Sequence, residues 1–197
     1  MGRRGIFWVV LLLAAACRPP VFTPKPAGYY RVDTPAAHTY RVFDRPGFPY
    51  TFEYPAYAEV TDDTISQNTR GSTRYWVNIS FGSLGGVINL TYKAISKEEP
   101  YMKLVAESDF LSFSHHEKAD YIDQLVFRFP GNGVSGILYT VGGNAATRYQ
   151  FTATDSVRHF MRGALYFNVT PNADSLKPAT DFLYPDIGHL LQTLHWR

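Results

Sequence analysis

Apolar and polar residues alternate along several short segments of this chain, which is the pattern of β-strands with one buried face. The clearest alternation lies in YWVNISF, residues 75–81, and the turn GSLGG then leads into VINLTY, residues 87–92, as a hairpin. A looser alternation covers residues 50–60. Four later segments also alternate, and short turns separate them: residues 121–129, 134–141, 146–155 and 159–169.

Two segments have the 3.6-residue period of amphipathic helices. In residues 96–120, Ser96 precedes two glutamates and a proline, as at the N-terminus of a helix. From Asp174 onward, leucine and isoleucine recur on one face, and Asp174 or Ser175 is the expected cap. We expect Pro185 to kink or restart this second helix, because proline lacks the backbone N–H that a helix needs.

This order of elements predicts an α+β fold in which helices flank an antiparallel sheet, because tight turns make successive strands antiparallel. The order resembles the Mog1/PsbP-like α/β/α sandwich. About 170 residues suit one domain, so we expect a single globular domain over residues 29–197. The loop at residues 61–74 is the longest irregular segment within it, and we expect this loop to be mobile or to contact a partner.

The N-terminal residues predict a bacterial lipoprotein. Arg3 and Arg4 precede the apolar run GIFWVVLLLAAA, which is shorter than the roughly 20 residues of a membrane-spanning helix and is typical of a signal peptide. Cys17, the only cysteine, directly follows this run. We therefore expect residues 1–16 to be a signal peptide and Cys17 to be acylated, which would anchor the chain to the bilayer. The alternative is an ordinary signal peptide or an uncleaved anchor.

Cleavage before Cys17 would change the charge of the chain. Lys and Arg number 19 and Asp and Glu number 17, so the loss of Arg3 and Arg4 leaves 17 of each and a net charge of zero. A generic electrostatic attraction to nucleic acid is therefore not supported. Four prolines lie between residues 19 and 26, and they favour an extended spacer. We expect residues 17–28 to be a tether between the bilayer and the domain.

One stretch, DSVRH, raises the question of catalysis. It places Asp155, Ser156 and His159 close together in the sequence, but a catalytic triad needs its groups to converge in space beside an oxyanion hole. A turn between two strands explains Asp155 and Ser156 without any chemistry. In the strand that follows, His159 shares a face with Met161 and Leu165, which predicts a core position. A periplasmic hydrolase built on these residues and His115 is the less favoured reading.

Two further motifs are weak. GNGVSG, residues 131–136, has the spacing of a nucleotide-binding loop, but a predicted strand follows it where a helix would have to hold the phosphates. His115 and His116 are adjacent, whereas helical zinc ligands stand four residues apart. We therefore expect no catalytic, metal-binding or cofactor-binding residues. The outward positions Trp76 and Asn78 are expected either to form a partner surface or to lie under a helix.

Three longer phrases resemble the family of the gliding motility lipoprotein GldD: GNAA at residues 143–146, HFMRGALYFNVTPNADSLKP at 159–178, and DIGHLLQTLHW at 186–196. The resemblance implies a non-enzymatic, periplasm-facing component of gliding motility and of the linked type IX protein secretion system. It implies that other gliding lipoproteins are the partners and that the chain assembles or stabilises them. It implies no catalytic residue. The alternative is a small-ligand or peptidoglycan-binding module, which rests on the aromatic content of 16%.

Overall fold

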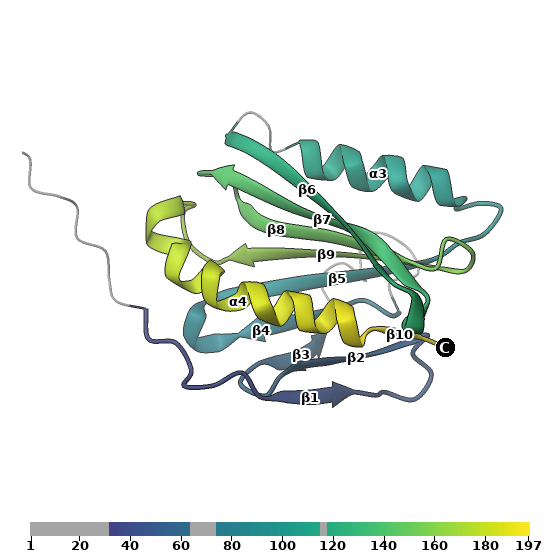
Figure 1. The fold of residues 1–197 in the computed structure, drawn as a ribbon, viewed down its shortest axis with the longest axis horizontal. Helices are drawn as coiled ribbons and strands as arrows, with labels where there is room; N and C mark the ends of the chain where they lie inside the picture. Colours follow the sequence, from purple (N-terminus) through teal and green to yellow (C-terminus); the bar gives the residue numbers. More distant parts are fainter. Residues whose placement is uncertain (1–31, 64–73, 115–117) are drawn as a thin grey trace, which may run out of the picture. The chain divides into compact units, whose positions relative to one another are not determined.

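The computed structural model of the chain describes residues 32–63, 74–114 and 118–197. Within these ranges the chain forms ten strands, two α-helices and two short 3-10 helices, and residues Arg31–Arg197 form one unit (Figure 1). Several predicted features lie outside the described residues: the signal peptide 1–16, the tether 17–28, Cys17, His115, His116 and most of the loop 61–74.

The larger sheet has seven strands in the order β3-β4-β5-β9-β8-β7-β6, and each neighbouring pair is antiparallel. Its strands are β3 (Glu59–Asp62), β4 (Val77–Phe81), β5 (Gly86–Ala94), β6 (Ala119–Phe129), β7 (Val134–Gly143), β8 (Thr147–Thr154) and β9 (His159–Phe167). The 3-10 turns η1 (Gly82–Leu84) and η2 (Pro130–Asn132) close two of the hairpins. The antiparallel α+β class and the order of strands from residue 75 to residue 167 are therefore confirmed.

A smaller sheet contains β1 (Tyr40–Phe43), β2 (Tyr50–Pro55) and β10 (His195–Trp196), in the order β1-β2-β10. The prediction of one strand over residues 50–60 was wrong, because Pro55 ends β2 and β3 then joins the other sheet. A turn separates the two strands, and in it the Ala58 N–H donates to the Pro55 carbonyl at 2.9 Å. Neither β1 nor β10 was predicted.

The helices α3 (Tyr101–Phe113) and α4 (Ala173–Thr193) lie on opposite faces of the seven-stranded sheet. On β8, Gln150 meets Ser112 of α3, whereas the next residue, Phe151, belongs to the core that α4 covers. Successive strand residues point to opposite faces, so the two helices sandwich the sheet (Figure 1). The outward positions Trp76 and Asn78 were expected to form a partner surface or to lie under a helix, and the helix on their side of the sheet is α3.

Both helices differ from their predicted ends. α3 begins at Tyr101 rather than near Ser96, whose hydroxyl instead accepts the N–H of Glu98 and of Glu99 in a turn ahead of the helix. α4 is capped by Asn172, which accepts the Ser175 N–H at 3.1 Å, and not by Asp174 or Ser175. The helix does not restart at Pro185 but runs on to Thr193.

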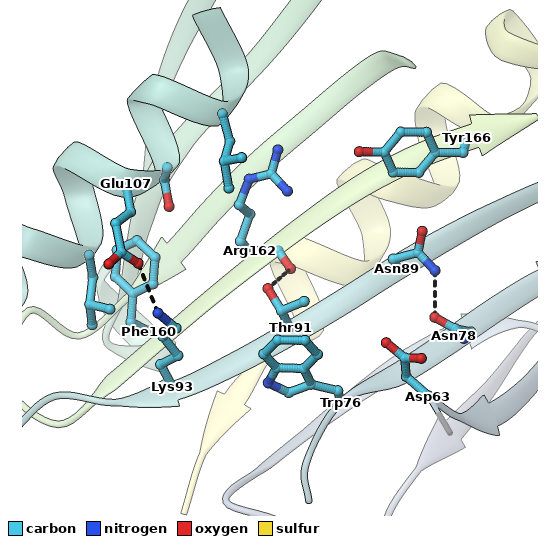
Figure 2. A pocket seen from close by; sticks show the side chains of 13 residues that line it. Asp63, Trp76, Asn78, Asn89, Thr91, Lys93, Glu107, Phe160, Arg162 and Tyr166 are labelled. Atoms are coloured by element: carbon cyan, nitrogen blue, oxygen red, sulfur yellow. Dashed lines mark hydrogen bonds and ion pairs between the residues drawn. The ribbon is translucent and has the colours of Figure 1, made fainter. Parts of the chain in front are cut away.

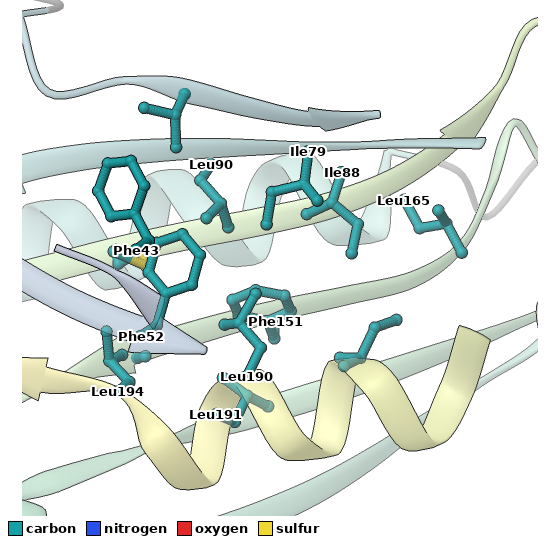
Figure 3. Close-up of a cluster of buried hydrophobic side chains, with 14 of the residues drawn as sticks. Phe43, Phe52, Ile79, Ile88, Leu90, Phe151, Leu165, Leu190, Leu191 and Leu194 are labelled. Atoms are coloured by element: carbon teal, nitrogen blue, oxygen red, sulfur yellow. The ribbon is translucent and has the colours of Figure 1, made fainter. Parts of the chain in front are cut away.

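The apolar core lies between α4, the smaller sheet and one face of the larger sheet (Figure 3). Met161 and Leu165 are buried there, as their alternation in the sequence predicted. Val169 was expected to continue the same face, but β9 ends at Phe167 and Val169 is exposed. The labelled core residues in Figure 3 are Phe43, Phe52, Ile79, Ile88, Leu90, Phe151, Leu165, Leu190, Leu191 and Leu194.

Candidate functional site

A polar groove lies between α3 and the part of the larger sheet formed by β4, β5 and β9, on the face opposite the apolar core (Figure 2). Its volume is about 380 Å³. The polar side chains on its sheet side alternate with core residues along the same strands. Each strand therefore contributes polar residues to the groove and apolar residues to the core on the opposite face. These side chains are Asn78, Asn89, Thr91, Lys93, Arg162 and Tyr166.

Hydrogen bonds between neighbouring strands and to the helix hold the groove in shape. Asn78 and Asn89 are opposite each other in the ladder, and their side-chain amides are bonded at 2.5 Å. Lys93 reaches from β5 to Glu107 of α3, with 2.8 Å between Nζ and Oε2. At the base of the groove, the Trp76 indole N–H donates to the Tyr92 carbonyl at 2.8 Å. Trp76 and Asn78 therefore line the groove beside α3.

Arg162 is the feature of this groove that points to a ligand. Its Nη2 donates to the Gln150 side-chain oxygen, but its buried Nε finds no acceptor among the described residues. Within the same ranges no carboxylate forms an ion pair with it. Burial lowers the pKa of the Arg162 guanidinium and Tyr166 opposes that effect, but a guanidinium stays charged in proteins. The groove thus holds a largely buried cation that lacks a counterion within the described part of the chain.

Gln150 adds a second donor without an acceptor. It is fully buried under α3, and its side-chain oxygen faces both Arg162 and the Ser112 hydroxyl, so its amide N–H₂ points elsewhere. That nitrogen has no acceptor among the described residues. Two adjoining side chains therefore offer N–H donors in excess, and charge-assisted bonds to an anion are the strongest that such donors make.

The structure does not bring Asp155, Ser156 and His159 together as a triad. Asp155 Oδ1 accepts three backbone N–H groups, those of residues 157–159, at 2.8–2.9 Å, which lowers the pKa of that carboxyl against the opposing effect of its burial. Ser156 sits in the left-handed region, with φ 63°, at the turn. His159 is buried, and its Nδ1 is 2.8 Å from the Tyr92 hydroxyl. These contacts describe a capped turn beside a core histidine.

The other sequence motifs also have structural explanations. GNGVSG forms the turn between β6 and β7, where Gly133 adopts φ 63°. A strand follows the turn, as expected. Within the described ranges, no group of three or more His, Cys, Asp or Glu side chains is placed to hold a metal ion.

Sequence reasoning missed a polar cluster around Asp186 of α4. The carboxylate is almost fully buried and accepts from His38 at 2.7 Å, from the Tyr40 hydroxyl at 2.9 Å and from the Tyr57 hydroxyl. Burial, followed by the Asp186 contact, raises the pKa of Tyr40 to about 12. The cluster joins α4 to the segment from residue 38 to 57. No local signal marks it, because the three donors lie 129 to 148 residues before Asp186.

Comparison with known proteins adds evidence of a different kind. The family described as gliding motility lipoprotein GldD matches residues 20–196 of this chain. Among curated proteins, no significant match was found. The solution structure of cyanobacterial PsbP from Synechocystis sp. PCC 6803 is similar with a TM-score of 0.44 and 11% identity, and the match covers 90% of this chain and 99% of that one. No described helix is long and apolar enough to cross a membrane.

Proposed function

Because this chain belongs to the gliding motility lipoprotein GldD family, we propose that it is a non-enzymatic component of the cell envelope that assembles or stabilises other gliding lipoproteins. It faces the periplasm and serves the linked type IX protein secretion system. The observation that carries the proposal is the family match over residues 20–196. The capped turn at Asp155 and the core position of His159 support a role without catalysis, since neither group reaches Ser156 as a base or an orienting residue.

The proposed anchor is an acylated Cys17, whose lipid chains bury enough methylene groups to hold the protein on a bilayer. Cys17→Ala is expected to move the protein from the membrane fraction to the soluble periplasmic fraction. Fractionation in high salt measures this, with a wild-type sample analysed by mass spectrometry for the lipid. Membrane retention of Cys17→Ala, together with an unlipidated wild type, would contradict the anchor.

The role itself is tested in a strain that lacks the gene. We expect loss of gliding, loss of type IX secretion and lower steady-state levels of other gliding lipoproteins, all restored by the wild-type gene. Immunoblots of membrane fractions report the lipoprotein levels. Restoration by a variant that carries both Asp155→Asn and Ser156→Ala supports a non-catalytic role. If that variant is present at the wild-type level yet restores nothing, the hydrolase alternative gains support.

The groove favours a second candidate function, the binding of an anionic small ligand such as a peptidoglycan fragment with free carboxylates. A planar guanidinium pairs with a carboxylate through two parallel bonds. Soluble muropeptides should therefore bind the wild type in calorimetric titrations and bind Arg162→Gln at least about 10-fold more weakly, as expected when a charge-assisted pair is lost. Arg41→Gln, at an exposed position on β1, is the matched control. Absence of binding to the wild type rules this candidate out.

A further inference from the structure

Strand β6 is unusually long for a strand at the edge of a sheet. It has 11 residues, Ala119–Phe129, and among the described strands it pairs only with β7. The opposite edge, β3, has four residues, of which two are acidic. Natural proteins shorten their edge strands or protect them with lysine or proline. β6 contains neither residue, and its protection is limited to three charged side chains and a β-bulge at its start. The edge from Ile122 to Phe129 can therefore accept another strand.

The side chains of β6 also favour the addition of a strand at this edge. Val126, Leu125 and Tyr121 are 75%, 56% and 45% exposed. Leu125 and Phe127 line a cavity of about 460 Å³ beside α4, and Val126 lines another of about 280 Å³ beside α3. Apolar surface is thus open on both faces of one edge strand. A strand added at this edge would cover both, with its own backbone bonded to β6.

From the sequence of this strand we propose that β6 pairs with β6 of a second copy of the chain, antiparallel, about a two-fold axis at Gln124. An axis of this kind leaves each face of the sheet continuous, so residues opposite each other must share a face. Each of the following contacts then occurs twice: Val126 opposite Ile122, Phe127 opposite Tyr121, and Arg128 opposite Asp120.

The pairs in this register are complementary. Apolar residues meet near the centre, aromatic residues meet next, and opposite charges meet at the ends; pairs of these kinds stabilise neighbouring strands. The β-bulge between Ala119 and Ile122 interrupts the regular alternation at Asp120 and Tyr121. The contact of Arg128 with Asp120 is therefore not a regular ladder pair and depends on the reach of the long Arg128 side chain. Leu125 opposite Asp123 is the one pair without such a match.

Other symmetric registers are worse. A shift of the axis to Leu125 places Arg128 opposite Ile122 and Phe127 opposite Asp123, and a shift to Asp123 places Val126 opposite Asp120. The axis at Leu125 thus gives two kinds of pair between a charged and an apolar side chain, and the axis at Asp123 gives one and also sets Asp123 opposite itself. The favoured register has only Leu125 opposite Asp123. The favoured pairing also places both α3 helices on one face of the joined sheet.

Disulfide cross-linking in intact membranes tests both the partner and the register. Residue 124 lies on the axis, so Gln124→Cys should yield a covalent homodimer under mild oxidation, because opposite Cα atoms are about 4.5–5.5 Å apart. In Leu125→Cys the new cysteines lie diagonally at about 7–8 Å, beyond the usual disulfide range. Cys17 is the only native cysteine, so the wild-type chain measures the background. Val42→Cys, at an exposed position on β1, is the control.

Three outcomes overturn the proposal: no homodimer from Gln124→Cys above background, equal or greater yield from Leu125→Cys, or an adduct of Gln124→Cys with a different protein. The proposal does not rest on the function of the family. A monomeric chain that still restores gliding would overturn it and leave the proposed function intact.

Charge reversal gives an independent test in the Gln124→Cys background. Arg128→Glu and Asp120→Arg each place like charges opposite each other twice, which should lower the homodimer yield by about 10-fold. The double variant restores opposite charges and should return the yield to within about 3-fold of the parent. Arg41→Glu makes the same charge change elsewhere and should have no effect. A double variant no better than the single ones contradicts the predicted contact.

Discussion

At the scale of single residues, Asp186 shows how one carboxylate joins distant segments. It is almost fully buried and accepts bonds from His38, Tyr40 and Tyr57. Removal of the carboxylate leaves three partly exposed donors without their acceptor. Water can reach such donors, so the total loss lies near that of one unpaired buried group, about 1–3 kcal/mol. The cluster thus stabilises the packing of α4 against the segment that precedes β3.

Asp186→Ala is accordingly expected to lower the free energy of unfolding by about 1–3 kcal/mol. Urea unfolding followed by tryptophan fluorescence measures it. Asp181→Ala on the same helix is the control, because Asp181 forms an exposed ion pair with Lys177 and such pairs contribute about 0–1 kcal/mol. Equal effects of the two substitutions would show that the cluster adds no more than a surface pair.

His159 gives a pH-dependent prediction at the same scale. Burial lowers the pKa of its imidazole, while Asp155 opposes the shift and Arg158 adds to it. The unfolded chain therefore binds a proton at a higher pH than the folded chain does, with an unfolded pKa of about 6.5. The stabilising contribution is complete above that pH and is lost as the pH falls from about 6.5 toward the lower folded value.

In His159→Gln the fall in stability between pH 7.5 and 5.5 should be shallower than in the wild type. Urea midpoints at several pH values in this range measure the slope. The exposed His195→Gln variant should keep the wild-type slope. If His159→Gln keeps it as well, protonation of His159 is not what weakens the fold in acid.

At the scale of elements, the absence of a side chain at Gly163 lets an aromatic ring of β8 pack directly against the backbone of β9. The ring of Phe151 on β8 lies over Gly163 on β9, and a Cβ added at Gly163 would be 2.1 Å from that ring. The ring is buried in the core, so it has little room to move. Gly163 thus permits the close packing of two central strands.

Gly163→Ala should destabilise the protein by about 1–3 kcal/mol, the usual cost of overpacking a core. Thermal and urea unfolding measure the change. Gly82→Ala is the matched control, because an added Cβ there meets no atom within 4 Å and the residue has no positive φ. A Gly163→Ala variant as stable as the control would mean that Phe151 shifts without cost.

At the scale of the whole described domain, the C-terminal segment ties the smaller sheet to the larger one. His195 and Trp196 pair with Thr51 and Tyr50 of β2, and the Trp196 ring stacks on His159 of β9 with centroids 5.1 Å apart. Leu194 is fully buried between them. The last turn of α4 also contacts β2, since the Glu53 N–H donates to the Thr193 hydroxyl at 3.0 Å.

Deletion of residues 194–197 should lower the free energy of unfolding by more than about 3 kcal/mol, because it removes a buried leucine and a stacked tryptophan. Calorimetry measures the loss. Deletion of Arg197 alone removes an exposed ion pair with Asp44 and a backbone hydrogen bond to the Pro49 carbonyl, and should cost no more than about 2 kcal/mol. Equal losses in the two truncations would argue against a role for Leu194 and Trp196 in joining the sheets.

The sequence alone determined the class of fold and the order of most strands. Alternation in segments such as residues 75–81 and turn residues such as Gly133 act locally, so they can be read without knowledge of the rest of the chain. It also predicted the core position of His159 and, through its longer phrases, the family. The prediction failed where pairing is non-local: β1 and β10 both depend on β2, and β10 lies more than 140 residues from it.

Only the tertiary structure decided the character of the sites. Arg162 lies next to the buried Met161 on β9 and lines the groove. That no described carboxylate pairs with it depends on which residues of α3 and the neighbouring strands lie beside it. The contacts of Asp186 likewise join α4 to residues 38–57. That β6 is an edge follows from the order of strands and not from its own residues. Burial, electrostatic pairing and edge position all depend on which distant segments meet, and local patterns do not encode that.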